Sequence, residues 1–257
     1  MSYPVQSALA CSPGIVAVIA ALREELAPLL SSLRAKKLCC RHKQKYYSST
    51  IRGQRVILVR AGIGFENVTK ALNFLNRISK PELVMNIGFA GALTGELEIG
   101  DVVFIKESIK WPECTKVQLK FQPISLQKFH GNFRTSPAVS LTVPRMVSKS
   151  KLSKLDVISK SEEEWVVDLE TFHYARICQD MEFPLVVVRS ITDTLGDEFS
   201  FNLEEITDKS GHVVPLLAFR LTMQRPALAP HFWHLWRVST KAATNLAKAT
   251  ISYIASK

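Results

Sequence analysis

The 257-residue chain lacks three features that define large classes of proteins. Its five cysteines are odd in number and form no C-x-x-C pair, so a reduced compartment fits better than a disulfide framework. No uncharged apolar run reaches the ~18 residues that a membrane-spanning helix needs. Residues 1–13 have neither the basic region nor the long apolar region of a signal peptide, and we interpret them as a flexible tail. We therefore expect a cytoplasmic protein.

The signature motifs of several enzyme classes are also missing. Without a G-x-S-x-G elbow or a G-x-x-x-x-G-K-[ST] loop, serine hydrolases of that type and P-loop proteins are excluded. No G-x-G-x-x-G turn indicates a dinucleotide site. His231 and His234 lie three residues apart, but no further zinc ligands are evident near them. We expect neither a metal nor a cofactor.

Positive charge is in excess, because 33 Lys and Arg outnumber 23 Asp and Glu and give a formal net charge of +10. Such a surface favours anionic partners. A nucleic-acid-binding module would also gather its basic residues on one face, with aromatic residues between them. Here the basic residues are scattered along the chain, so we expect no nucleic-acid partner.

The most informative stretch is 165–197. Trp165–Val167 is a short apolar run, Leu169–Met181 has helical spacing, and Leu185–Val188 is a β-branched run typical of a strand buried on both faces of a sheet. The acidic residues of this stretch, Glu170 and Asp193 among them, come after the strands. In open α/β sheets the loops at the carboxyl ends of strands carry the ligand site, so we expect these carboxylates to face one cleft.

The remaining pattern predicts one α/β domain over residues 1–257, since 47% hydrophobic residues can bury a large core and no linker divides the chain. Residues 34–43 read as a basic loop, and 226–257 as a region with a long C-terminal helix. Further strands are predicted at Ile15–Ala21, Tyr46–Ile51, Arg55–Arg60, Leu83–Ile87, Val102–Ile105 and Leu155–Ser159, and further helices at Glu24–Leu33 and Phe65–Ile78.

Three acidic residues, Glu25, Glu170 and Asp193, each follow a predicted strand, and glycine-containing turns lie near Gly64 and Gly91. Carboxylates with separate roles are what cleavage of a glycosidic bond requires: one protonates the leaving group, and another activates water or stabilises the sugar cation. The same residues could instead be helix caps or salt-bridge partners, and Glu25 could simply complement a helix dipole.

Six motifs in order resemble the nucleoside phosphorylase and nucleosidase superfamily, in particular its methylthioadenosine/S-adenosylhomocysteine nucleosidases. The similarity covers about residues 15–106 and 164–197. It implies a three-layer αβα sandwich around a twisted mixed β-sheet, a small-molecule nucleoside substrate and a homo-oligomer. The motifs are IAALREELAPLL (19–30), AGIGFENVTKAL (61–72), NIGFAGAL (86–93), GDVV (100–103), VDLE (167–170) and VVVRSITD (186–193).

The resemblance also implies roles for the three acids. Glu25 corresponds to the residue that activates water, Glu170 to the one that holds the ribose hydroxyls, and Asp193 to the donor to N7 of the purine. Protonation of N7 lets the base leave as a neutral molecule. The other residues expected to bind the substrate are Gly64, Phe89, Ala90, Gly91, Ile158, Leu169 and Arg189.

Two departures bear on the nucleophile. Phosphorylases of the superfamily have a phosphate-binding Arg at the position of Asn86 and a hydroxyl residue at that of Phe89, so this chain favours water. A phosphorylase remains an alternative if Arg60 or Arg189 binds phosphate. A non-catalytic binding or storage protein on the same fold is a second alternative, although all three acids are present.

The C-terminal region resembles the hopanoid-associated nucleosidases, through GHVVPLL, RPALAPHFWHLWR and an Ala-rich basic helix. That branch implies release of adenine from adenosylhopane. Phe232, Trp233 and Trp236 are flanked by Arg237 and Lys241, a composition that suits a helix at an anionic lipid surface. We therefore expect peripheral contact with the inner face of the membrane, although Phe232 and Trp236 on one side of the helix could instead pack on the sheet.

Overall fold

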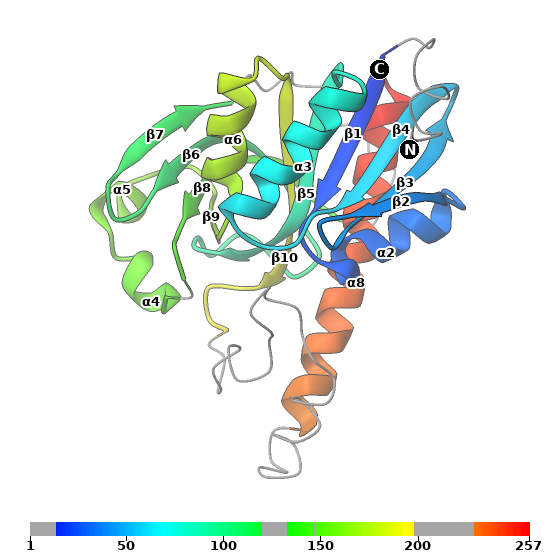
Figure 1. Cartoon of the computed structure of the whole chain (residues 1–257). Coiled ribbons are helices and arrows are strands. Elements are labelled where there is room, and N and C mark those ends of the chain that lie inside the picture. Colours follow the sequence, from blue (N-terminus) through cyan, green and yellow to red (C-terminus); the bar gives the residue numbers. More distant parts are fainter. Residues whose placement is uncertain (1–13, 120–132, 146, 198–228) are drawn as a thin grey trace.

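The computed structural model describes residues 14–119, 133–145, 147–197 and 229–257. A mixed sheet of ten strands forms the middle layer, with helices on both faces (Figure 1). Within the described residues the helices are α2 (Arg23–Ser32), α3 (Phe65–Ile78), α4 (Lys149–Leu152), α5 (Asp156–Ser159), α6 (Thr171–Asp180) and α8 (Ala229–Ala255). The strands are β1 (Ile15–Ala20), β2 (Lys36–Arg41), β3 (Gln44–Ile51), β4 (Gln54–Arg60), β5 (Leu83–Ala92), β6 (Val102–Lys110), β7 (Thr115–Gln118), β8 (Thr135–Thr142), β9 (Trp165–Asp168) and β10 (Leu185–Asp193).

The central strand β1 shows how the sequence produces the layers. Successive side chains of a strand point to opposite faces, and every residue of β1 is apolar and buried. Ile15, Ala17 and Ile19 pack in the same core cluster as side chains of α3 and α6. Val16 and Val18 pack in the opposite cluster with α2 and α8. The predicted three-layer αβα sandwich is confirmed.

Part of the sheet closes on itself. β5 pairs with β10 and β9, β10 pairs with β6, and β8 pairs with both β6 and β9, so five strands form a ring. The other arm of the sheet continues from β5 through β1, β4 and β3 to β2. In Figure 1 the arrowheads of β1 and β10 point to the same edge of the molecule. Loops from distant parts of the chain therefore meet at this edge.

Several predictions about individual elements hold, and two are wrong. The strand–helix–strand order of 165–197 appears as β9, α6 and β10. The run Leu155–Ser159, predicted to be a strand, instead contains the single-turn helix α5. Residues 34–43, predicted to be a loop, contain β2, which pairs with β3. The predicted tail at 1–13 lies outside the described residues.

The predicted C-terminal helix is present as α8, and its burial changes along its length. From Val238 onward it presents Ala242, Ala243, Leu246 and Tyr253 as buried residues to the core. Its first turns extend beyond the sheet, on the side to which β1 and β10 point (Figure 1). In the part of the chain that is described, no helix is both long and apolar enough to span a bilayer.

Candidate functional site

A cavity of about 440 Å³ lies at the carboxyl ends of β1, β5, β9 and β10. Eight of the ten residues predicted to form the site line it, although they come from four separate regions of the chain. This agrees with the rule that α/β sheets bind ligands at the carboxyl ends of their strands. The eight are Glu25, Phe89, Ala90, Gly91, Leu169, Glu170, Arg189 and Asp193.

The other two predicted residues lie elsewhere. Gly64, just before α3, does not line the cavity, but its amide donates a 2.6 Å hydrogen bond to Oε1 of Glu170. Its φ of 97° lies in the left-handed region that favours glycine. Ile158 is only 3% exposed and packs in a separate core cluster with Leu93 and Trp165. The structure does not bring Ile158 to the cavity, because its place in the single-turn helix α5 directs it into that cluster.

Glu25 lies in the first turn of α2 and is 5% exposed. Oε2 accepts a 2.8 Å hydrogen bond from the amide of Leu22, and Oε1 accepts one of 3.0 Å from the amide of Phe89 in β5. Burial raises the pKa of Glu25, while these two amides and Arg189 partly oppose the increase. Glu25 therefore caps the start of α2, as the helix-end alternative expects, and it also links α2 to the cavity wall at Phe89.

Glu170 comes directly before α6 and is also buried. Burial raises its pKa to about 7, the hydrogen bond from Gly64 opposes this shift, and the neighbouring Glu25 adds to it. A carboxylate has the acceptor geometry to hold two adjacent hydroxyl groups. Both the neutral and the ionised form of Glu170 are therefore populated near neutral pH.

We expect Glu170 to make stability depend on pH. Between pH 4.5, its ordinary pKa, and about 7, the unfolded chain loses a proton that the folded protein keeps. The wild-type free energy of unfolding should therefore fall across this window, relative to that of Glu170→Gln, by on the order of 3 kcal/mol. Denaturant unfolding at the two ends of the window measures this difference.

The control for this experiment is Glu66→Gln, because the side chain of Glu66 is 83% exposed. Its stability relative to wild type should stay nearly constant across the same window. A wild-type protein that becomes more stable than Glu170→Gln as the pH rises would contradict the expected direction.

Asp168, the residue that ends β9, lines the cavity and is the centre of a hydrogen-bond network. Its carboxylate accepts hydrogen bonds from Ser140, Thr142, Thr171 and Arg189, and from the amide of Glu170. Burial alone would raise the pKa of Asp168, but Arg189 and the hydrogen bonds outweigh burial and lower it. Asp168 is therefore an ionised structural acceptor that links three strands to α6.

Arg189 is buried in the same network. Its Nε donates to Asp168 over 3.1 Å, and its Nη2 donates to Oδ1 of Asn86 over 2.6 Å and to Oγ1 of Thr171 over 2.8 Å. Its remaining nitrogen, Nη1, donates to the carbonyl oxygen of Val188 over 3.4 Å and lies beside Gly88. Most of the N–H groups with which Arg189 could bind an anion thus already donate hydrogen bonds within the protein.

Asp193 ends β10 and lies against Gly91 of β5. A methyl group added at Gly91 would be 2.6 Å from Oδ2 of Asp193, so only glycine leaves room for this carboxylate. Oδ1 accepts a 2.8 Å hydrogen bond from the hydroxyl of Thr192. Oδ2 accepts one of 2.6 Å from Nζ of Lys149, at the start of α4.

Sequence reasoning missed several residues of this cavity. Lys149 lies in a Ser-rich basic segment where it resembles the exposed lysines around it, and no spacing distinguished it. Val147 and Ser148, also on the cavity wall, belong to the same segment. Asp197, which accepts hydrogen bonds from the amide and hydroxyl of Thr194, follows a strand and could have been found by the rule that located Asp193.

Comparison with known proteins agrees with this geometry. The model of the phosphorylase superfamily matches residues 15–138. A 5'-methylthioadenosine/S-adenosylhomocysteine nucleosidase from Hydrogenovibrio crunogenus is 27% identical over 235 residues, which cover 80% of this chain and 97% of that protein.

Solved structures share the fold. A mutant Helicobacter pylori nucleosidase with 5'-methylthioadenosine in its active site has a TM-score of 0.71 at 17% identity, and the match covers 96% of this chain and 100% of that one. Futalosine hydrolase from the same organism has a TM-score of 0.69 at 16% identity, with coverage of 95% and 98%. In sequence and in fold the chain is therefore similar to the nucleoside phosphorylases and nucleosidases of the phosphorylase superfamily, and the nucleosidases among its relatives identify it as an enzyme of this type.

Proposed function

We propose that this protein is a purine nucleosidase, which releases adenine from a 5'-substituted adenosine by attack of water. The observation that carries the proposal is the meeting of Glu25, Glu170 and Asp193 on one cavity wall. Nucleosidases and a futalosine hydrolase among its relatives support the same chemistry.

The environments of the three acids suit three different tasks. Glu25, whose pKa is raised by burial, is a suitable general base for the attacking water. Oε1 of Glu170 accepts a hydrogen bond from the Gly64 amide, which leaves Oε2 to accept hydrogen bonds from ribose hydroxyls. Asp193, at the end of β10, is available to deliver a proton to N7 of the base. Protonation there withdraws electrons from the C1′–N9 bond, which then breaks with its electron pair on the purine.

The charges around the cavity favour water over phosphate as the nucleophile. Among the described residues, five carboxyl groups line it but only two basic side chains, Lys149 and Arg189, and both are paired with carboxylates. Asn86 donates to the carbonyl of Ile19 and accepts from Arg189 within the sheet. Arg60, the other suggested phosphate ligand, does not line the cavity.

The proposal predicts a free sugar as product without added phosphate. Incubation with 5'-methylthioadenosine, S-adenosylhomocysteine or a longer 5'-alkyl adenosine should release adenine and the free 5'-substituted ribose. Chromatography of both products, with and without phosphate, is the measurement. The rate should not change with phosphate. A ribose 1-phosphate product, formed at a rate that saturates with phosphate, would make the protein a phosphorylase.

An apolar 5' substituent, of which adenosylhopane is the extreme case, is the finer part of the proposal. Much of the cavity wall is apolar, including Leu22, Ile63, Phe89, Val143 and Val147. Apolar lining favours an apolar substituent, because its burial removes hydrocarbon surface from water.

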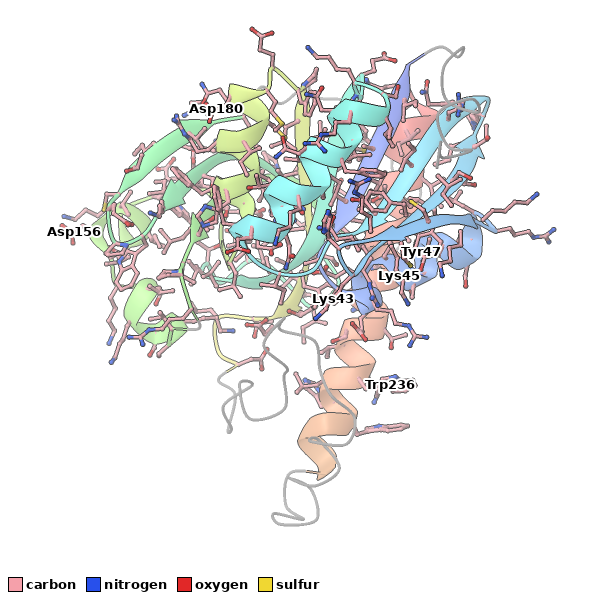
Figure 2. All side chains as sticks on the ribbon, viewed as in Figure 1. Lys43, Lys45, Tyr47, Asp156, Asp180 and Trp236 are labelled. Carbon is pink, nitrogen blue, oxygen red and sulfur yellow. The ribbon has the colours of Figure 1, made fainter. Side chains whose placement is uncertain are left out.

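The projecting part of α8 supports contact with a membrane that holds such a substrate. Trp233 and Trp236 are 62% and 61% exposed, and their ring centroids are 5.2 Å apart. The possibility that Trp236 packs on the sheet is therefore wrong, and Figure 2 shows this side chain on the part of α8 beyond the sheet. Arg237 is exposed beside the pair. Exposed Trp with basic neighbours suits the boundary between lipid and water.

We expect reversible binding to vesicles that contain anionic lipid. Binding should weaken with salt, because basic residues contribute to it, and should weaken further in the Trp233→Ala, Arg237→Ala double variant. Sedimentation with anionic and with zwitterionic vesicles measures it. The matched control is Val157→Ala, Lys154→Ala, which removes one exposed apolar side chain and one exposed cation elsewhere. Absence of vesicle binding at low salt would remove this part of the proposal and leave the nucleosidase chemistry in place.

A further inference from the structure

The side chain of Lys149 is buried beside the proposed proton donor. It is 7% exposed, and Nζ contacts Oδ2 of Asp193 at 2.6 Å and also donates to the carbonyl oxygen of Thr194. Lysine is among the residues least often buried, and burial of its ion pair carries a large desolvation cost. Exposed lysines on the same segment, such as Lys151, show that α4 does not require a buried lysine here.

The hydrogen bonds of Asp193 indicate that its carboxyl group does not itself hold the proton that N7 receives. Both of its oxygens accept hydrogen bonds, Oδ1 from Thr192 and Oδ2 from Lys149. This arrangement fits the ionised carboxylate, which is an acceptor only. An ionised Asp193 cannot by itself protonate N7, whereas the ammonium group 2.6 Å away carries a proton.

We propose that Lys149 supplies the proton that Asp193 passes to the base, an inference that rests on the proposed nucleosidase function. One N–H bond of the ammonium breaks as an O–H bond forms on Asp193. That O–H bond breaks as the N7–H bond forms, and the C1′–N9 electron pair moves onto the purine. The base leaves neutral, Glu25 takes the proton of the attacking water, and Lys149 regains a proton from solvent while Glu25 loses one.

Burial makes this transfer feasible. In a poorly solvated site an ion pair loses much of its advantage over the neutral amine and carboxylic acid. N7 becomes more basic only as the glycosidic bond breaks. The proton is therefore transferred to N7 during cleavage of that bond. Thr194 holds the nitrogen in place throughout. The titratable or charged groups that face this pair or share its cavity are Glu25, Asp168, Glu170, Arg189, Asp197 and His234.

Two substitutions separate the proton from the charge. Lys149→Met keeps the unbranched apolar stem but removes both the charge and the proton, whereas Lys149→Arg keeps a charge that cannot be given up as a proton. With 5'-methylthioadenosine at neutral pH, both variants should lose kcat by about 10²-fold or more. Lys149→Met should recover part of its rate in acid, because Asp193 then takes its proton from solution. Lys151→Met, with an exposed side chain on the same helix, is the control.

A second substrate tests the step itself. The leaving group of 4-nitrophenyl β-D-ribofuranoside needs no proton, so wild type and both Lys149 variants should cleave it at equal rates. Equal losses on both substrates with an unchanged pH profile would show a structural role and overturn the inference. So would a Lys149→Arg enzyme that is fully active on the nucleoside. If wild type releases no base from any nucleoside, the proposed function itself fails, which is a distinct result.

Discussion

Replacement of Asp193 by Asn should lower the rate of base release by about 10²–10⁴-fold, the usual contribution of a general acid. Asn has nearly the same size, so it fits in the narrow space against Gly91, and its oxygen can still accept a hydrogen bond from Lys149. It cannot pass on a proton. The variant should therefore fold and bind the nucleoside but not release adenine.

Turnover of a 5'-substituted adenosine and the thermal unfolding midpoint, measured on the same preparations, check this expectation. Asp156→Asn is the control, since Asp156 pairs with Lys160 at the surface (Figure 2) and should not affect turnover. If Asp193→Asn retains more than about a tenth of wild-type turnover, the role of general acid belongs to another residue.

Glu25→Gln should lower kcat by a similar factor of about 10²–10⁴, with little change in KM. Gln cannot take a proton from water. The amide nitrogen of Gln is a donor and not an acceptor, so the variant loses an acceptor either for the amide of Leu22 or for that of Phe89. Glu24→Gln is the matched control, because Glu24 is the exposed neighbour in the same helical turn.

Steady-state kinetics of Glu25→Gln and Glu170→Gln side by side separate the two roles. Loss of Glu170 should raise KM as well, because that residue is proposed to hold the ribose. A Glu25→Gln enzyme with normal kcat would mean that Glu25 only stabilises the start of α2 and its contact with β5.

The positions of the three acids could be predicted because each lies at or shortly after the end of a strand that contains a buried apolar run. The buried runs of β1 and β10 end in short polar segments, and the geometry of a parallel sheet then brings Glu25 and Asp193 together. Local sequence was sufficient to locate these acids, because the end of a buried strand is marked by the change from apolar to polar residues. The partners of these acids were not predictable in this way.

The failures have physical causes. Leu155–Ser159 reads as a strand because Val157 is β-branched and Ile158 apolar, but one turn of helix buries Ile158 while Val157 faces solvent. Lys149 has the sequence context of a surface lysine. It lies against Asp193 only because the tertiary fold brings α4 next to the end of β10. The hydrogen-bond network of Asp168 likewise joins residues that lie 21 to 28 positions apart.

The buried contact between Asn86 and Arg189 has a consequence for how this protein could evolve. The resemblance to the superfamily's phosphorylases implies an arginine at the position of Asn86. Here the side-chain oxygen of Asn86 is 2.6 Å from Nη2 of Arg189, so a second guanidinium group would enter the sheet beside the first. Two such charges without water or a new carboxylate would repel each other strongly. A route to a phosphate-dependent descendant therefore cannot begin with this substitution alone. It must first release Arg189 from Asp168 and Thr171, and each of those steps weakens the fold before any new activity appears.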